Sequence, residues 1–259
     1  MTDLGGQDGS GTGTGSLGGQ RILVTGASRG IGRAIARACL AAGAATVGVG
    51  YRAPSDAASA LLSEDPERTL GLEADLNDPQ AAAAQVERFV EAAGGIDALV
   101  LNAGVNHPGL LLQSSLEELE ATLRVNLLAP LVAAKAALEP MLRARRGTIL
   151  FVSSVAALRP SKGQCAYAAS KGGLESLVRA LGVEVGRKGI RVVGLRPGPT
   201  ETDMFRATAQ LAGDQVKADV PLRRFAKPAE IAAAACYLLG PAASYVHGTV
   251  HGVDGGYAG

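Results

Sequence analysis

Tyr167 and Lys171, the ends of the segment Tyr-Ala-Ala-Ser-Lys, are residues whose types and spacing could carry acid–base chemistry. Two residues four apart on a helix share one face, with about 5–6 Å between their Cβ atoms. A free phenol has a pKa of about 10, and a nearby ammonium group favours the phenolate. The pair could therefore exchange a proton with a substrate oxygen. Taken alone, the spacing also describes an ordinary pair on a helix surface.

A glycine-rich segment near the N-terminus, Thr-Gly-Ala-Ser-Arg-Gly-Ile-Gly at 25–32, has the pattern of a nucleotide-binding turn. It follows a predicted strand and precedes a predicted helix. Glycine permits a tight turn and close approach of the backbone to a pyrophosphate, and the helix N-terminus offers free N–H groups to the phosphates. The residues of this turn expected to bind the dinucleotide are Gly26, Ser28, Arg29, Gly30, Ile31 and Gly32.

The end of the second predicted strand indicates which dinucleotide binds. A carboxylate there would accept hydrogen bonds from the ribose hydroxyls, whereas a basic residue would favour a 2′-phosphate. The strand ends in Tyr51-Arg52 without a carboxylate, and Arg29 supplies a second cation. Arginine's planar fork suits phosphate. We therefore predict NADP(H) rather than NAD(H); the alternative is that both arginines are solvated surface residues.

Two further strand ends are expected to contact the cofactor. Asp75-Leu76 closes the third strand, where Asp75 could accept a hydrogen bond from the adenine amino group, because helix capping falls to Asn77 or Asp78 ahead of a proline. Asn102-Ala103-Gly104 closes the fourth strand, where small residues let the backbone approach the cofactor.

Short β-branched runs alternate with alanine-rich helical stretches along the chain. Several strands are almost wholly apolar, which is typical of a sheet covered by helices on both faces. This order predicts one α/β domain, a doubly wound sheet of about seven parallel strands with helices on both faces. The predicted strands are 21–25, 46–51, 69–74, 98–101, 148–153, 190–195 and 249–253. The predicted helices are 31–43, 55–64, 79–93, 116–144, 164–187 and 228–239. Residues 20–259 are expected to form this domain, and the glycine-rich residues 1–19 a flexible tail.

Composition excludes several function classes. The 25 basic and 24 acidic residues leave a formal charge of +1, so the chain lacks the basic excess of nucleic-acid-binding proteins. It also has no tryptophan on which a base could stack. Three dispersed cysteines argue against a disulfide framework, and three dispersed histidines do not predict a metal site. The uncharged run 231–253 is interrupted by glycine, proline and histidine, so we read it as helix, turn and strand rather than a membrane span. We expect a cytoplasmic protein that acts on a small molecule.

The motifs together resemble the short-chain dehydrogenase/reductase family over residues 20–259. The matching features are the glycine turn, Asn102-Ala-Gly104, Tyr167-x-x-x-Lys171 and three further elements. Those elements are Asn126, Ser154 and Pro197-Gly198, with Ser154 standing 13 residues before Tyr167 and Asn126 standing 41 before it.

The resemblance implies a Rossmann-type fold and a role for each matching residue. Tyr167 would be the proton donor in reduction, Lys171 would favour the tyrosinate and bind the nicotinamide ribose, and Ser154 would orient the reacting oxygen. Asn126 would hold a water of a proton relay. The turn Pro197-Gly198 would contact the nicotinamide, together with the backbone near Thr200 and the hydroxyl of Thr202.

A neighbouring serine and a polar segment bear on this set. Ser153 is the rival to Ser154, and since neighbouring strand residues point to opposite faces, only one can serve the site. The polar, weakly periodic residues 205–220 are expected to form a mobile lid over the substrate, or an ordinary surface helix.

Within the family the chain is most similar to 3-oxoacyl-[acyl-carrier-protein] reductases, and to ketoreductases of polyketide assembly. That resemblance implies an acyl carrier protein that docks near Arg145 and Lys188, although a solvated basic surface is equally compatible with these residues. It also implies a homotetramer. The alternatives are a dehydrogenase of a free secondary alcohol, sugar or steroid, and a nucleotide-sensing protein without turnover.

Overall fold

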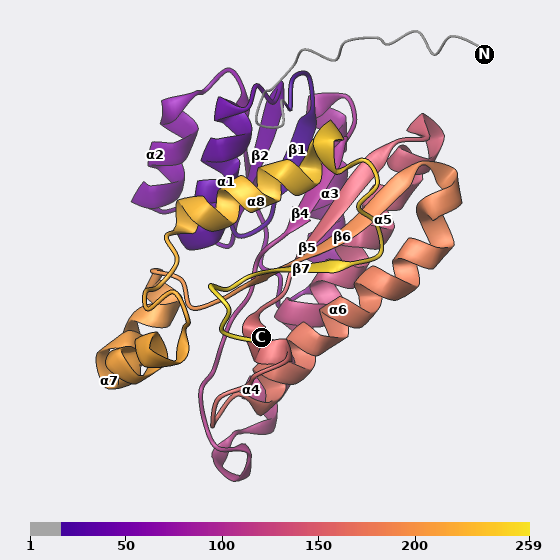
Figure 1. Cartoon of the computed structure of the whole chain (residues 1–259). Coiled ribbons are helices and arrows are strands. Elements are labelled where there is room, and N and C mark those ends of the chain that lie inside the picture. The colour runs from indigo at the N-terminus through magenta and orange to yellow at the C-terminus, as the bar shows by residue number, and fades with distance from the viewer. Residues whose placement is uncertain (1–16) are drawn as a thin grey trace, which may run out of the picture.

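The computed structural model describes residues 17–259, with the side chains of these residues except 207–212. Seven parallel strands form one sheet in the order β3-β2-β1-β4-β5-β6-β7 (Figure 1). The strands are β1 (Arg21–Val24), β2 (Thr46–Tyr51), β3 (Thr69–Glu73), β4 (Ala98–Leu101), β5 (Gly147–Val152), β6 (Ile190–Pro197) and β7 (Val250–Val253). The predicted doubly wound α/β fold is confirmed.

Within residues 17–259, eight α-helices connect or follow the strands. They are α1 (Gly30–Ala41), α2 (Asp56–Glu64), α3 (Pro79–Ala93), α4 (Leu116–Leu123), α5 (Ala129–Ala144), α6 (Cys165–Val185), α7 (Asp203–Asp219) and α8 (Pro228–Leu239). The single helix expected at 116–144 is in fact α4 and α5 joined by a π-helical turn, Arg124–Leu128. The polar residues 205–220 lie almost wholly in a helix, α7, which begins at a cap formed by the Thr202 side chain.

The apolar strands are explained by two cores, one on each face of the sheet. Ile22 and Val24 of β1 pack in a cluster with residues of α1 and α8, whereas Leu23 between them packs in a second cluster with residues of α3, α5 and α6. Successive strand side chains point to opposite faces. Because both faces are covered, β1 has no solvent-facing side and reads as a continuous apolar run.

The helical run Leu116–Ala144 is, within the described residues, long and apolar enough by length and composition to cross a membrane. Ala133, Ala137 and Met141 of this run are buried in the second cluster. A core helix of a globular domain passes the same test. The run 231–253 is a helix, a 3-10 turn and a strand, as the sequence indicated.

The N-terminal segment was expected to be a flexible tail through residue 19. Residues 1–16 of that tail lie outside the described residues. Leu17 is fully buried beside α1, and its N–H group donates to Ala42 O at 2.8 Å. Leu17 therefore packs against the first helix of the domain.

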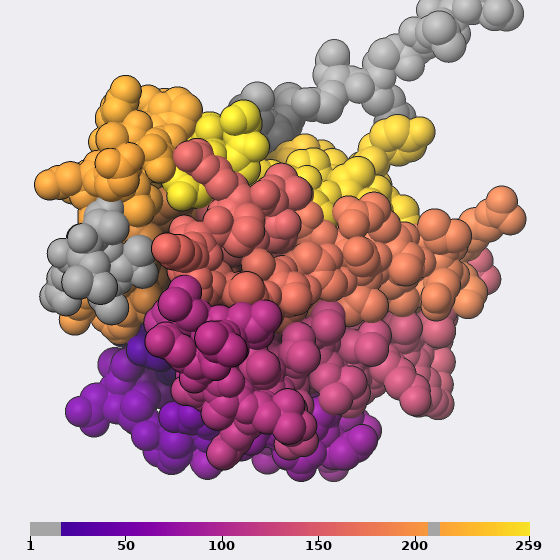
Figure 2. Space-filling model, turned by 90° about the horizontal axis from the view of Figure 1, so that it is seen from below, coloured from indigo at the N-terminus to yellow at the C-terminus, as the bar shows by residue number. Residues whose placement is uncertain are grey.

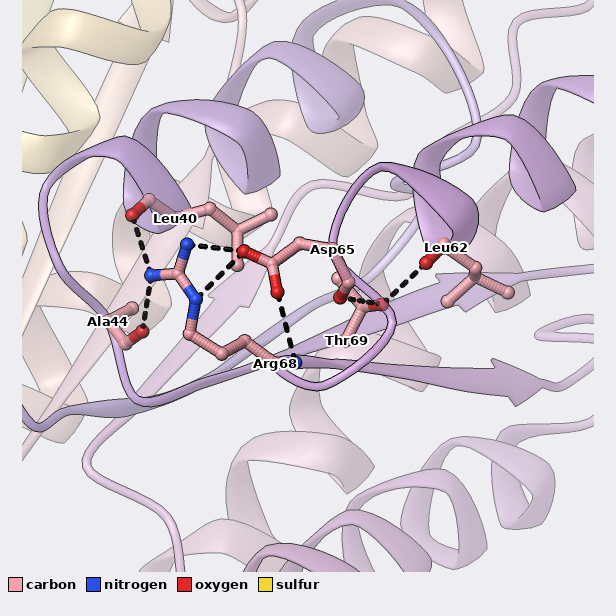
Figure 3. A network of polar contacts seen from close by, with 6 residues as sticks. All are labelled: Leu40, Ala44, Leu62, Asp65, Arg68 and Thr69. Carbon is pink, nitrogen blue, oxygen red and sulfur yellow. Dashed lines mark hydrogen bonds and ion pairs between the residues drawn. The ribbon is translucent and has the colours of Figure 1, made fainter.

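Arg68 ties the turn between α2 and β3 to the end of α1 (Figure 3). Its Nη1 donates to Leu40 O at 3.1 Å and to Ala44 O at 3.4 Å, and its Nε donates to the Asp65 carboxylate at 2.8 Å. The Leu40 carbonyl belongs to the last turn of α1, where main-chain carbonyls lack partners within the helix. The guanidinium thus gives the Leu40 carbonyl, which also accepts from the Gly43 N–H at 3.0 Å, a second donor and holds the loop that leads into β2.

We predict that Arg68→Met lowers the free energy of unfolding by about 1–2 kcal/mol, because the Leu40 and Ala44 carbonyls lose a charged donor. Urea denaturation followed by circular dichroism measures the loss. Arg179→Met, at an exposed arginine of α6, is the matched control and should change stability by less than about 0.5 kcal/mol. Equal losses in the two variants would contradict the role given to Arg68.

Candidate active site

A cleft of about 850 Å³ runs along the carboxyl ends of the strands. Every site residue predicted from the sequence lines it except Asn126, which is fully buried behind it. Figure 2 views the molecule from the side on which α4 and α7 lie, with α7 in orange at the upper left. The fold therefore gathers residues from 26 to 202 into one cavity, as expected for a parallel sheet.

The glycine turn is held in place by the end of β4. Thr25 Oγ1 accepts from the N–H groups of Asn102 and Ala103 at 3.0 and 3.1 Å. The Asn102 amide donates to the carbonyls of Thr25 and Gly26 at 3.0 and 3.1 Å. Asn102 thus orients the turn through its side chain, a contact that the sequence did not predict.

Two glycines of the turn leave no room for a side chain. Gly26 has φ of 64°, and a Cβ there would lie 2.8 Å from Ala103 Cα. A Cβ on Gly32 would overlap the Gly26 carbonyl and the Asn102 amide. The turn runs into the N-terminus of α1, whose first N–H groups are available to an anion. This cradle fits the pyrophosphate of a dinucleotide.

The predicted 2′-phosphate contacts lie together at one end of the cleft. Arg52 follows β2 and is exposed, and Arg29 is exposed and pairs with Asp203 at 3.9 Å. Ser55, which caps α2 by accepting from the Ala58 N–H at 3.2 Å, also lines this end of the cleft. Sequence reasoning missed Ser55, because its place depends on how the loop after β2 folds back.

Asp75 lies at the end of β3, where it was expected. Its Oδ1 accepts from the Asn77 N–H at 3.0 Å, and Asp78 rather than Asp75 caps α3 by accepting from the Gln80 N–H at 2.9 Å. The carboxylate is exposed and lines the cleft. One of its oxygens is therefore used locally and the other faces solvent.

Tyr167 and Lys171 stand on the first turns of α6 and face the cleft. Lys171 is buried, its Nζ lies 5.8 Å from the centre of the Tyr167 ring, and it donates to Val152 O at 2.9 Å. Burial lowers the pKa of Lys171 to about 8. Burial raises the pKa of Tyr167, and a hydrogen bond with Ser154 opposes that rise. Lys171 was expected to lower the pKa of Tyr167, but in this structure the rise caused by burial of the phenol is larger.

Ser153 and Ser154 have different partners, which separates the two rivals. Ser153 Oγ donates to Glu175 Oε1 at 2.9 Å and to Lys171 O at 3.2 Å, in a buried network that includes the ion pair of Glu175 with Arg196 at 2.7 Å. Ser154 Oγ accepts from the Ala156 N–H at 3.2 Å, lines the cleft and opposes the rise in the pKa of Tyr167. The geometry therefore gives Ser153 a structural partner and leaves Ser154 beside the phenol.

Asn126 occupies the π-helical turn between α4 and α5. Its Oδ1 accepts from the Val105 N–H at 2.8 Å, and its Nδ2 donates to Val105 O at 2.8 Å and to Ser170 Oγ at 3.1 Å. A Cβ on Gly104 would lie 3.3 Å from Asn126 Oδ1 and 3.5 Å from Lys171 Nζ. Asn126 thus joins the loop after β4 to α6, and its side chain is fully engaged. Such π turns are frequent at functional sites.

The turn after β6 packs against the glycine turn. Thr200 is buried, and its hydroxyl donates to Gly198 O at 2.8 Å. Thr202 accepts from the Phe205 N–H at 3.3 Å, and a Cβ on Gly30 would lie 3.4 Å from Thr202 Cγ2. The start of α7 is therefore fixed beside the pyrophosphate cradle.

The cleft is also lined by polar residues that sequence reasoning did not assign to the site. They are Asn106, His107, Ser161, Gln164 and Arg159. Arg159 lies over the Tyr257 ring at 4.4 Å, donates to Tyr257 O at 2.8 Å and pairs with Asp219 at 3.4 Å. It joins the loop after β5 to the end of α7 and to the C-terminal segment. No local pattern marks these residues, because they come together only in the fold.

The predicted carrier-docking residues lie at the opposite edge of the sheet. Arg145 lies two residues before β5 and Lys188 two residues before β6, both exposed, whereas Ser154 follows β5. Six strand residues span about 20 Å. In a single chain, Arg145 and Lys188 are therefore separated from the cleft by the length of a strand.

The chain is similar in sequence and in fold to known enzymes. A family model described as enoyl-(acyl carrier protein) reductase matches residues 26–258. The 3-oxoacyl-[acyl-carrier-protein] reductase of Chlamydia trachomatis is 37% identical over 247 residues, 95% of this chain and 100% of that protein. A short-chain dehydrogenase from Burkholderia cenocepacia in complex with NADP has a TM-score of 0.85 and 36% identity, over 94% of this chain and 100% of that one. A putative 2-deoxy-D-gluconate 3-dehydrogenase from Agrobacterium tumefaciens with bound NADP has a TM-score of 0.86 and 33% identity, over 93% and 97%.

The buried Lys171 predicts a specific dependence of stability on pH. Its pKa is about 8 in the folded chain and 10.5 as the ordinary value. Between these values the unfolded chain binds the proton and the folded chain does not, so the cost of burying the ammonium is present below pH 8 and is relieved as pH rises to 10.5. Over that window the unfolding free energy of the wild type should rise relative to Lys171→Met, by about 3 kcal/mol.

Urea denaturation at several pH values measures this difference, and the subtraction removes titrations that both proteins share. Lys162→Met, at an exposed lysine of the loop before α6, controls for the loss of a surface charge. A constant difference between the wild type and Lys171→Met across the window would show that the ammonium is not buried at a cost.

Proposed function

The chain belongs to the short-chain dehydrogenase/reductase family, and on that premise we propose that it reduces a ketone to a secondary alcohol with NADPH. It is an NAD(P)-dependent oxidoreductase. We propose that its substrate is the 3-oxo group of an acyl thioester carried by an acyl carrier protein, in fatty-acid or polyketide assembly. The observation that carries the proposal is that Ser154, Tyr167 and Lys171 line one cleft, where Lys171 Nζ lies 5.8 Å from the centre of the Tyr167 ring.

The cofactor proposed is NADP(H), and its fit rests on this chain's own residues. The glycine turn leaves a cradle for the pyrophosphate, and Arg29 and Arg52 are exposed cations without a carboxylate at the end of β2. The solved relatives from Burkholderia cenocepacia and Agrobacterium tumefaciens carry NADP. Bound NADPH would supply a hydride to the carbonyl carbon of the substrate.

The side chains around the cleft would handle the proton. Ser154 would donate a hydrogen bond to the carbonyl oxygen and orient it, and Tyr167 would deliver its phenolic proton to that oxygen as negative charge develops. The Lys171 ammonium would stabilise the resulting tyrosinate, which the raised pKa of Tyr167 makes necessary. Asn126 would hold the relay water through its main chain, because its side chain is engaged by Val105 and Ser170.

Carrier docking and assembly are proposed with the same substrate. Arg145 and Lys188 would receive an acidic carrier protein, and because they lie at the edge of the sheet away from the cleft, the acyl group would enter the site of another chain. A homotetramer would bring Arg145 and Lys188 of one chain close to the cleft of another. Leu123, Leu128 and Leu131, exposed on the run that includes α4 and α5, would be covered in it. We expect the protein to be cytoplasmic.

A second candidate is a dehydrogenase of a polyhydroxylated acid or another free alcohol. The gluconate-type relative is about as similar as the carrier-protein reductase. The polar residues Asn106, Gln164 and Arg159, which line the cleft, favour a substrate with several hydroxyl groups. The description of the family model also names enoyl reduction. That reaction reduces a carbon–carbon double bond, whereas the hydroxyl groups of Ser154 and Tyr167 in one cleft favour a ketone.

We predict that the protein oxidises NADPH in the presence of an acetoacetyl thioester, and that Tyr167→Phe lowers the rate by at least about 10²-fold while retaining cofactor binding. The absorbance of the reduced nicotinamide measures the rate. Tyr245→Phe, at a fully exposed tyrosine, is the matched control. Turnover of gluconate-type alcohols alone would favour the second candidate, and turnover of a crotonyl thioester alone the enoyl reaction. Cofactor binding without any turnover would indicate a nucleotide-sensing protein.

We predict that Arg52→Ser weakens NADPH binding by about 10- to 100-fold and leaves NADH binding unchanged, because only NADPH carries the phosphate that the guanidinium would contact. Fluorescence titration of each reduced cofactor measures the two dissociation constants. Arg179→Ser controls for the loss of a distant surface cation. Wild-type affinity for NADH that equals the affinity for NADPH would refute the cofactor assignment.

A further inference from the structure

Arg159, in the loop after β5, contacts two other elements of the chain through its guanidinium. Its Nη1 donates to Tyr257 O at 2.8 Å, and its Cζ lies 4.4 Å from the centre of the Tyr257 ring. Its Nη2 lies 3.4 Å from Asp219 Oδ2, at the last residue of α7. Arg159 and Tyr257 both line the cleft. One side chain thus joins the C-terminal segment and the end of α7 to the loop after β5.

This junction lies beside the segment that carries Ser154. Val155, the next residue, forms a buried cluster with Val220 and Tyr257. Val216 of α7 packs against this cluster. Val155, Val216 and Tyr257 also line the cleft. The loop after β5, the end of α7 and the C-terminal segment therefore form one wall of the cleft, next to the serine proposed to orient the ketone.

The C-terminal segment is itself held in place. The Asp254 carboxylate accepts from the N–H groups of Gly256 and Ala258 at 2.9 and 3.2 Å. A Cβ on Gly198 would lie 2.5 Å from Asp254 Cα, so the segment packs directly on the turn after β6. Arg159 therefore joins the end of α7 to a part of the chain that the sheet already positions.

The helix α7 buries little of its surface. None of its described side chains, which are those of 203–206 and 213–219, is buried. Near its start, the Phe205 ring meets the Phe225 ring edge-on, with 4.9 Å between the centroids. A segment with few buried apolar contacts opens locally at a low cost in free energy. The ion pair of Arg159 with Asp219 therefore bears on whether the end of α7 stays against the cleft.

We propose that Arg159 is a positioning residue, whose guanidinium fastens the end of α7 and the C-terminal segment to the loop that carries Ser154 and so keeps the cleft closed around a bound ketone. Arginine suits this role, because its planar fork can donate to a carbonyl, pair with a carboxylate and stack on a ring at the same time. The rival role for Arg159 is direct binding of substrate hydroxyl groups.

This inference rests on the proposed function for only one of its two measurements. The Michaelis constant of an acetoacetyl thioester depends on the proposed ketone reduction. Tryptic cleavage after Lys217, near the end of α7, needs no turnover. Cleavage within a helix requires local opening, so its rate at low trypsin concentration follows the population of the open form. Mass spectrometry of the fragments identifies the bond that is cut.

We predict that Arg159→Met raises KM about 5- to 10-fold with kcat within about threefold, and speeds cleavage after Lys217 about 5- to 10-fold. Asp219→Asn should raise KM and the cleavage rate about threefold. The double variant should be no worse than Arg159→Met alone, because the two residues act through one contact. Arg179→Met and Asp214→Asn, at exposed residues of α6 and α7, are the matched controls and should keep wild-type values.

Wild-type KM and cleavage in Arg159→Met, in a protein that melts at the wild-type temperature, would overturn the inference. A raised KM without faster cleavage would assign Arg159 to the substrate itself, and faster cleavage without a raised KM would show that closure does not serve the ketone. Effects that add in the double variant, or tighter ketone binding in Asp219→Asn, would also refute it. A wild type that reduces no ketone would reject the proposed function, and the cleavage rates would then decide whether Arg159 holds α7.

Discussion

Seven strands that run in one direction bring all their carboxyl ends to the same edge of the sheet, and the chemistry of this protein depends on that arrangement. The glycine turn follows β1, Arg52 follows β2, and Ser154 follows β5. Parallel strands require helices on both faces, and these helices bury the apolar side chains of every central strand. Packing stability and the position of the site therefore have the same physical origin.

Hydrogen bonds between strand ends convert that shared edge into a defined cavity. Asn102 holds the glycine turn from β4, and Asn126 joins the loop after β4 to α6. The buried ion pair of Glu175 with Arg196 joins α6 to the end of β6 beside Ser153. Buried networks of this kind are rigid because each lost bond leaves an unsatisfied group. Their combined effect is to fix α6, and with it the tyrosine and lysine, against the cofactor-binding edge.

Burial shapes the electrostatics of the site in opposite directions for its two titratable groups. It lowers the pKa of Lys171 to about 8 and raises the pKa of Tyr167. A phenol that resists ionisation is a proton donor, which suits reduction of a carbonyl, and a lysine that is costly to bury as an ion gains from any negative charge formed beside it.

The sequence by itself determined the α/β class, the parallel sheet and most element boundaries, because apolar runs, glycine turns and helix caps are local signals. The resemblance to the short-chain dehydrogenase/reductase family also brought Ser154, Tyr167 and the glycine turn into one expected site, and all of them line the cleft. Tertiary structure alone decided the π turn at Asn126 and the place of Arg159. These features arise from contacts between residues far apart in the chain, where burial and hydrogen bonding depend on neighbours that no local pattern encodes.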